Sequence, residues 1–150
     1  MAGQMTYVKS NTLAGGVGSY SVVVDLGLSI EEAARIMGVA LSVEFTGASL
    51  PVSQGQAAYS YDPEDAVVDP EDDEQFALVG LAELLTGATG GQKRSEFGFL
   101  DFSGMNMITT RNLALILTVA GTAMAVHGRV YYERYKPSDR DLVQLIATRR

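Results

Sequence analysis

The chain has 150 residues and a mass of 16.0 kDa, which is the size of a single domain. It contains no cysteine and one histidine, His127, so disulfide frameworks, Cys-ligated metals, thiol catalysis and sites built from several imidazoles are excluded. Eighteen acidic residues against eleven basic ones give a net charge of −7, which opposes general binding to nucleic acid or to anionic membranes. The composition therefore argues against most enzymes.

Charge is unevenly distributed along the chain. Residues 129–150 carry six basic and three acidic side chains, a net charge of +3, so residues 1–128 carry −10. The most membrane-like segment, residues 113–126, has fourteen uncharged residues, whereas a membrane-spanning helix needs roughly 20. The first twenty residues show no secretory signal pattern. We therefore expect no transmembrane segment, and a tail of opposite charge to the rest of the chain.

The first half of the chain predicts strands with one helical excursion. Residues 1–19 are expected to be a flexible N-terminal segment, in which only residues 5–9 are counted as a strand. Residues 20–28 and 39–46 alternate apolar with smaller or polar side chains and predict half-buried strands. Between them, Ser29-Ile-Glu-Glu32 has the capping-box pattern and predicts a short helix over residues 29–37. The side chains expected to face the core are Tyr20, Val22, Val24, Leu26, Leu28, Val39, Leu41, Val43 and Phe45.

The middle of the chain predicts further short strands. Residues 56–61 and 97–102 each fit a strand, and the second follows a Gly-rich loop over residues 86–96. Residues 75–85 are continuously apolar and fit either a buried strand or a short helix. We favour the strand, because the neighbouring segments are β.

The end of the chain carries the strongest β signal and then a helix. Residues 112–120 and 122–135 are separated by Gly121 and are expected to be consecutive antiparallel strands. Pro137 then blocks continuation of the strand, and Ser138 is a good N-cap for a terminal helix over about 138–148. Its apolar stripe consists of Leu142, Leu145 and Ile146, so the helix is expected to pack on another surface.

These elements predict the fold class. About eight strands without alternating long helices indicate an all-β antiparallel sandwich or barrel, and an eight-stranded jelly roll fits the count. We expect one domain over residues 1–150, with a short helix after the second strand and a short C-terminal helix within residues 138–150.

Residues 62–74 form a strongly acidic loop with eight carboxylates, in which the tetrapeptide Asp-Pro-Glu-Asp occurs twice. Self-repulsion and two prolines keep the segment out of the core. Clustered carboxylates can bind calcium or magnesium, although the EF-hand pattern is not met. A solvated loop is the favoured interpretation, and acidic adaptation to a salty environment is an alternative. The weak metal candidates are Asp62, Glu64, Asp65, Asp69, Glu71 and Asp72.

The sequence offers few groups for catalysis. His127 lies in a strand, where a hydrogen-bonded sheet residue is a better interpretation than a catalytic base. Neither a G-x-S-x-G nucleophile elbow nor a complete phosphate-binding loop occurs. We expect no catalytic residues, no cofactor and no enzymatic activity.

Aromatic and basic side chains interleave near the C-terminus, a pattern that can stack on single-stranded nucleic acid. Strand alternation divides them between two faces, so tyrosines of the core and of an interface are the favoured interpretation. The residues concerned are Tyr131, Tyr132 and Tyr135 among Arg129, Arg134 and Lys136.

Four segments of the chain together resemble a known group of proteins. They are Val24-Asp-Leu-Gly-Leu-Ser-Ile-Glu-Glu-Ala33, Ile108-Thr-Thr-Arg-Asn-Leu-Ala114, Arg129-Val-Tyr-Tyr-Glu-Arg-Tyr135 and the segment from Ser138 to Arg150. The pattern resembles small virion proteins of the single jelly-roll type from icosahedral viruses of bacteria and archaea, and touches about half of the chain. The resemblance implies a capsid subunit of the virion that self-assembles with copies of itself, and with other capsid proteins, into an icosahedral shell.

If the chain is such a subunit, its terminal helix and last strand are the expected contacts, at Tyr135, Arg140, Leu142, Leu145 and Ile146. Alternatively, the helix only closes its own sandwich. Residues 1–19 contain one basic side chain, Lys9, rather than a basic arm, so genome contact is expected to be weak or indirect. Two other functions stay open: a soluble β-sandwich binding module for carbohydrate or a calcium-dependent ligand, and a cupin-like enzyme, which the single histidine disfavours.

Overall fold

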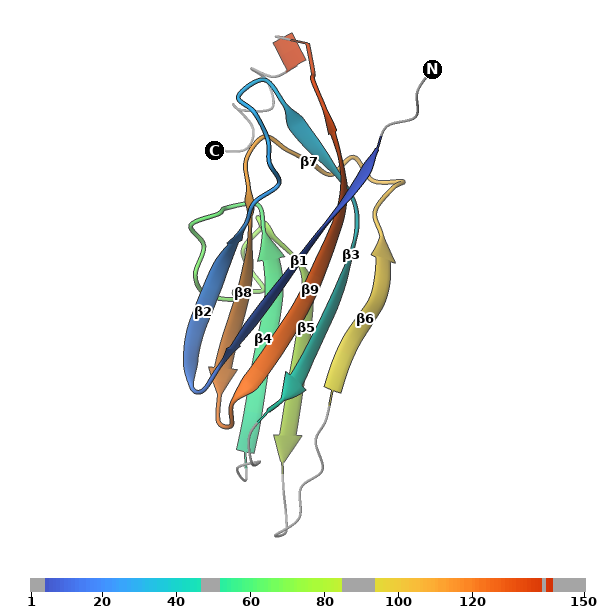
Figure 1. The fold of residues 1–150 in the computed structure, drawn as a ribbon. Coiled ribbons are helices and arrows are strands. Elements are labelled where there is room, and N and C mark those ends of the chain that lie inside the picture. Colours follow the sequence, from blue (N-terminus) through green and yellow to red (C-terminus); the bar gives the residue numbers. More distant parts are fainter. Residues whose placement is uncertain (1–4, 47–51, 85–93, 139, 142–150) are drawn as a thin grey trace.

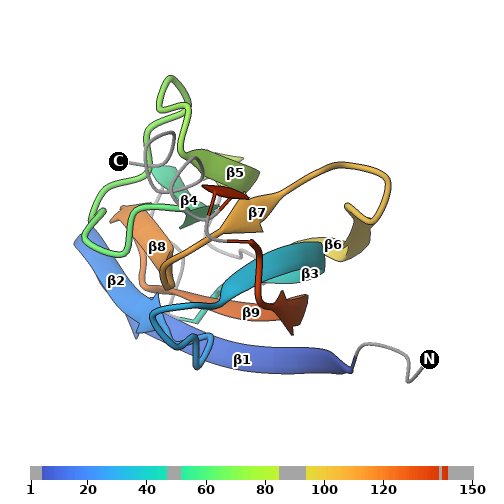
Figure 2. The same cartoon turned by 90° about the horizontal axis from the view of Figure 1, so that it is seen from above.

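A computed structural model describes residues 5–46, 52–84, 94–138, 140 and 141, and the fold is given for these residues. They form two antiparallel sheets that face each other as a sandwich (Figures 1 and 2). The strands are β1 (Thr6–Gly15), β2 (Gly18–Val24), β3 (Ala33–Phe45), β4 (Val52–Ser60), β5 (Gln75–Leu84), β6 (Arg94–Asp101), β7 (Ile108–Thr109), β8 (Leu113–Ala120) and β9 (Met124–Tyr135). One sheet, sheet A, has the order β1-β9-β3-β6, with β7 added on β3. The other, sheet B, has the order β2-β8-β4-β5.

The strand pairs are nested along the chain. The first strand pairs with the last, β1 with β9, and the second pairs with β8. Further inward, β3 pairs with β6, and β4 with its immediate successor β5. If the two-residue strand β7 is left out and the strands are renumbered, the pairs run 1–8, 2–7, 3–6 and 4–5, as in one long antiparallel ribbon whose strand pairs alternate between the two sheets.

Period-two alternation explains why these segments form strands that face one another. In β2 and the residues after it, Val24 and Leu26 are buried, whereas Val23 and Asp25, which alternate with them, are exposed. In β3, the side chains predicted to face inward are all buried, at Val39, Leu41, Val43 and Phe45. The prediction of a strand over residues 75–85, rather than a helix, is confirmed by β5.

β8 has apolar side chains on both faces, and both faces are covered. Leu113, Leu115 and Leu117 face sheet A across the core, while Ala114 and Ile116 point to the opposite side of sheet B. Those two residues pack against Val68 of the acidic loop, which lies over that side of the sheet. The continuous apolar run of β8 is therefore explained by burial on two faces.

The core contains a tyrosine that spans the space between the sheets. Tyr59 of β4 is fully buried, and its hydroxyl points at the backbone of Gly128 on β9. Among the described residues this hydroxyl has no hydrogen-bond partner, and burial raises its pKa. By contrast, the hydroxyl of Tyr132 donates to the Leu26 carbonyl oxygen at 2.9 Å.

The two tyrosines give opposite predictions for the same substitution. Tyr59→Phe removes a buried hydroxyl without a partner and is expected to raise the free energy of unfolding by about 1 kcal/mol. Tyr132→Phe removes a satisfied donor and leaves the Leu26 carbonyl without it, so a loss of about 1 kcal/mol is expected. Urea denaturation of both variants measures the difference. Equal destabilisation by both would contradict the assignment of Tyr59.

The helix predicted over residues 29–37 is wrong. The capping pattern does form one turn: Ser29 N–H donates to Glu32 Oε1 at 3.0 Å, and Glu32 N–H donates to the Ser29 carbonyl at 3.1 Å. The Ser29 N–H also holds the pKa of Glu32 below its usual value. The turn does not propagate, because residues from Ala33 onward pair with β9 and bury Ala33, Ala34 and Ile36.

Two other expectations are corrected. The strand expected over residues 5–9 within a flexible segment is longer in the structure: residues 6–15 form β1 in an unbroken ladder with β9, and β2 begins at Gly18. The two strands around Gly121 do not pair with each other as a hairpin. β8 lies in sheet B and β9 in sheet A, so Gly121, with φ of 104°, turns the chain from one sheet to the other.

The predicted terminal helix lies almost wholly outside the described residues. Within them, Arg140 and Asp141 are helical, and Asp141 N–H donates to Ser138 Oγ at 3.3 Å, which is the expected N-cap contact. In the described part of the chain, no helix has the length and apolar character that crossing a membrane requires.

Candidate functional site

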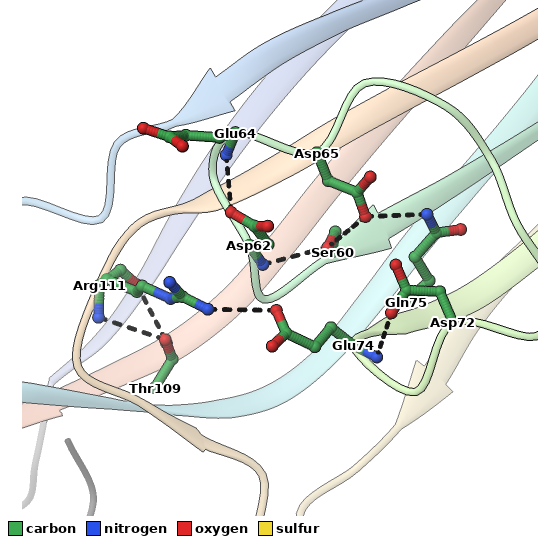
Figure 3. A network of polar contacts seen from close by, with 9 residues as sticks. All are labelled: Ser60, Asp62, Glu64, Asp65, Asp72, Glu74, Gln75, Thr109 and Arg111. Carbon is green, nitrogen blue, oxygen red and sulfur yellow. Dashed lines mark hydrogen bonds and ion pairs between the residues drawn. The ribbon is translucent and has the colours of Figure 1, made fainter. Parts of the chain in front are cut away.

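The acidic loop is built from two copies of the same turn. Asp62 Oδ1 accepts the N–H of Glu64 at 3.0 Å, and Asp69 Oδ1 accepts the N–H of Glu71 at 3.0 Å (Figure 3 shows the first). In each copy the fourth residue donates its N–H to the carbonyl of the first. Proline at the second position presets the backbone for such a turn. The repeated tetrapeptide is therefore explained by local backbone structure.

A buried glutamine fastens the loop to the end of β4. Gln75 Nε2 donates to Asp65 Oδ2 at 2.9 Å and to the Val67 carbonyl at 2.8 Å, while its Oε1 accepts the Asp69 N–H at 2.8 Å. The hydroxyl of Ser60 donates to the same Asp65 oxygen at 3.0 Å (Figure 3). One carboxylate and one amide thus hold both halves of the loop together.

An apolar contact and an ion pair complete the attachment. Val68 is buried on sheet B and its N–H donates to Thr118 Oγ1 at 3.1 Å. At the other end, Arg111 Nη2 lies 3.1 Å from Glu74 Oε2 (Figure 3). Both side chains of this pair are about one third exposed, so the pair contributes only a fraction of a kcal/mol. The loop is folded and covers part of sheet B through Val68, while the carboxylates of Glu64, Asp69, Glu71 and Asp73 are exposed, as expected of a solvated loop.

The carboxylates proposed as metal ligands are used by the loop itself. Oxygens of Asp62, Asp69 and Asp72 accept backbone N–H groups, and those of Asp65 accept Ser60, Ala66 and Gln75. Within the described residues no three acidic or histidine side chains are placed to hold a metal ion. The structure therefore does not bring Asp62, Glu64, Asp65, Asp69, Glu71 and Asp72 together around one point.

His127 lies on the outer face of sheet A. Its Nε2 is 3.4 Å from Glu44 Oε1 on β3, and its Nδ1 is 3.3 Å from Thr12 Oγ1 on β1. The imidazole is half exposed, and the prediction of a hydrogen-bonded sheet residue is confirmed. Beside it lies a shallow depression of about 390 Å³, lined by Ser10, Asn11, Thr12, Ala40, Leu41, Ser42, His127, Gly128, Arg129 and Tyr131.

A second shallow depression of about 350 Å³ lies on the outer face of sheet B. Its floor includes Gly80 and Ala120, and two glutamines of β4, Gln54 and Gln56, border it. In the depression beside His127, the Thr12 hydroxyl lies 3.3 Å from the imidazole Nδ1, but both side chains are exposed. The two depressions offer hydrogen-bonding groups on open surfaces rather than an enclosed reaction site.

The aromatic and basic residues of β9 are divided between its two faces, as alternation predicts. Tyr132 is buried and stacks on Tyr7 of β1, with ring centroids 5.6 Å apart. The Arg134 guanidinium lies 4.1 Å from the Tyr7 ring centroid, and its Nη1 donates to the Gly27 carbonyl at 2.9 Å. These residues fasten β1 and the 25–32 turn to the end of β9.

The residues proposed for subunit contacts are only partly described. Tyr135 ends β9 on the opposite face from Tyr132 and lies 5.6 Å from the Arg35 guanidinium carbon. Arg140 is exposed. Leu142, Leu145 and Ile146 lie outside the described residues.

The structure adds a surface that sequence reasoning missed, the paired edges formed by β1 and β2. β1 lies at one edge of sheet A, and β2 lies at one edge of sheet B. Both ladders run without a register shift, whereas the ladders of the opposite edge strands, β5 and β6, each contain one. The sequence of β1 contains β-forming residues and a single charge, which is a signal for a strand. It lacks strong alternation of apolar and polar residues, so the length of the strand was not predicted.

Comparisons with known proteins identify no family. No protein-family model matches the chain, and no curated protein matches it. Among solved structures, it resembles a chain from "Structure of infectious bursal disease virus Gx strain", with 10% sequence identity and a TM-score of 0.33. The alignment covers 90% of this chain and 32% of that chain.

Proposed function

We propose that the chain is a jelly-roll capsid subunit, a structural virion protein that self-assembles into an icosahedral shell and acts without catalysis. The observation that supports the proposal most is the nested strand pairing. With β7 left out, pairs 1–8, 2–7, 3–6 and 4–5 distributed over two four-stranded sheets are the arrangement expected of an eight-stranded jelly roll. Viral capsid domains are one of the main groups that use this architecture.

The distribution of side chains supports a role in assembly. The space between the sheets is filled by Tyr59, Phe45, Leu41 and other apolar residues, so function falls to the outer surface. There, the regular edges of β1 and β2 leave backbone groups available to a neighbour, and Val8 and Val23 are exposed beside them. A tile that contacts copies of itself uses surfaces of this kind.

The partners in this proposal are copies of the chain and other capsid proteins. The net charge of −7 supports weak or indirect contact with a genome, because an acidic protein is repelled by nucleic acid. Such a subunit needs no cofactor and no small-molecule substrate.

Sedimentation velocity tests the proposal. Purified full-length protein, run over a hundredfold range of concentration at low and moderate salt, is expected to form large, discrete assemblies as concentration rises. A single species of 16.0 kDa at every concentration would overturn it.

A soluble carbohydrate-binding module is the second candidate, and the depression beside His127 favours it. Ser10, Thr12, Arg129 and the Tyr131 ring present the donors, acceptors and aromatic surface that sugar-binding sites use. Calorimetric titration with a panel of oligosaccharides tests this function. Saturable binding by a monomer, lost in Arg129→Ala, would favour the module over the capsid subunit.

A further inference from the structure

Among the described strands, β1, β2, β5 and β6 lie at the edges of the two sheets, and they differ in their protection against pairing with another chain. β5 contains a bulge where Ala77 adopts φ of 56°, and the β3–β6 register shifts between Val39 and Leu41. Such irregularities are a common way to prevent pairing at an edge. β1 and β2, on the other side of the sandwich, have none.

β1 has the features of an edge that accepts a strand. It is ten residues long, pairs with β9 in one continuous register and contains neither proline nor an acidic residue. Its one charged side chain, Lys9, belongs to the less exposed set of the strand. The outward set is Thr6, Val8, Ser10, Thr12 and Ala14, and Val8 in it is 51% exposed.

We infer that β1 pairs antiparallel with β1 of a second copy about a two-fold axis, which joins two copies of sheet A into one continuous sheet. The inference rests on the proposed function and names one of the contacts that a shell would use. Both partners in a two-fold contact offer the same surface, so that surface must be compatible with itself. A strand with a single charge in ten residues meets this condition.

The alternation of β1 limits the register. Directly opposite residues of two antiparallel strands point to the same side of the sheet, so each outward residue of one copy must face an outward residue of the other. This requires that the two-fold axis passes beside one residue of β1, which then faces itself. Ser10 is the middle member of the outward set and is the residue that we place on the axis. Ser10 then faces Ser10 of the second copy, Val8 faces Thr12 and Thr6 faces Ala14. In this register Lys9 faces Asn11, so no like charges are directly opposed.

Single-cysteine crosslinking tests this arrangement, because the chain has no cysteine of its own. Ser10→Cys is expected to form a disulfide-linked dimer under mild oxidation in the assembled protein. The matched control is Ser21→Cys, on the exposed face of the β2 edge, which is expected to crosslink at least tenfold less. Equal or weaker crosslinking of Ser10→Cys would overturn the β1 pairing.

A charge pair provides an independent test of the register. Val8→Lys/Thr12→Lys opposes like charges at two symmetry-related positions, whereas Val8→Lys/Thr12→Glu opposes unlike charges at the same positions. Dimer affinity measured by sedimentation is expected to be on the order of tenfold lower in the first variant than in the second. Equal affinities would overturn the register. If the protein assembles but neither the crosslinking nor the charge-pair result is obtained, only the β1 contact is refuted. If neither the wild-type protein nor any variant assembles, the proposed function is refuted as well.

Discussion

A methyl group added at Gly128 is expected to lower the free energy of unfolding by about 2–3 kcal/mol and Tm by roughly 5–10 °C. The Cβ of Gly128→Ala would lie 2.1 Å from the Tyr59 hydroxyl oxygen and 2.9 Å from Cζ of the same ring. Tyr59 has no free space to move into, because its side chain is fully buried between the sheets. The backbone of β9 or the ring must therefore shift, and either movement disturbs contacts across the core.

Two further variants identify the cause of that loss. Gly104→Ala is the matched control, since a methyl group there meets no atom within 4 Å, and its stability should stay within about 0.5 kcal/mol of wild type. Combining Gly128→Ala with Tyr59→Phe is expected to recover part of the loss, because the nearest clashing atom is removed. Thermal denaturation followed by circular dichroism measures all three. Strictly additive effects of the two substitutions would show that Gly128 and Tyr59 are not in contact.

Gln75→Glu is expected to destabilise the protein by about 2–3 kcal/mol at pH 7, and by much less near pH 4.5. In the wild-type protein, Gln75 Nε2 donates to the Asp65 carboxylate at 2.9 Å and to the Val67 carbonyl at 2.8 Å. The substitution replaces this donor by a carboxylate oxygen, which would face two acceptors and be repelled by them. The introduced carboxyl would have a higher pKa in the folded than in the unfolded chain, because the fold favours its protonated form. The folded state then binds more protons, so stability is lost as pH rises through that folded pKa.

The control for this variant is a glutamine in an exposed position. Gln56→Glu places the same charge on the outer face of sheet B, away from this network, and is expected to change stability by less than about 0.5 kcal/mol. Urea denaturation of both variants and the wild type at pH 4.5 and 7 provides the comparison. A Gln75→Glu defect that does not depend on pH would mean that Gln75 does not hold the loop through Asp65.

Local alternation was enough to predict much of the sandwich from sequence. The inward faces of β2 and β3 follow directly from residues such as Val24, Leu41 and Phe45. The helix over residues 29–37 was wrong because a capping pattern describes only one turn, and the following residues gain more by pairing with β9. The pairing of β8 and β9 was wrong because a short connection around Gly121 fits a hairpin as well as a crossing between sheets.

The candidate surfaces were harder to predict, because they depend on long-range pairing. The acidic loop was expected to be solvated, and the sequence did not predict that Val68 would be buried on sheet B, because Ala66 and Val67 beside it are exposed. Gln75 gave no sign in the sequence that it would hold Asp65. The edge position of β1 follows only from its pairing with a strand more than one hundred residues away, at Thr6 and Glu133 for example.

Electron microscopy of the purified full-length protein, imaged under conditions in which sedimentation detects assembly, tests the central claim most directly. Closed, regular shells of uniform diameter are expected, with class averages that have icosahedral symmetry. A field of separate 16.0 kDa molecules, or aggregates without regular form, would contradict the assignment as a capsid subunit.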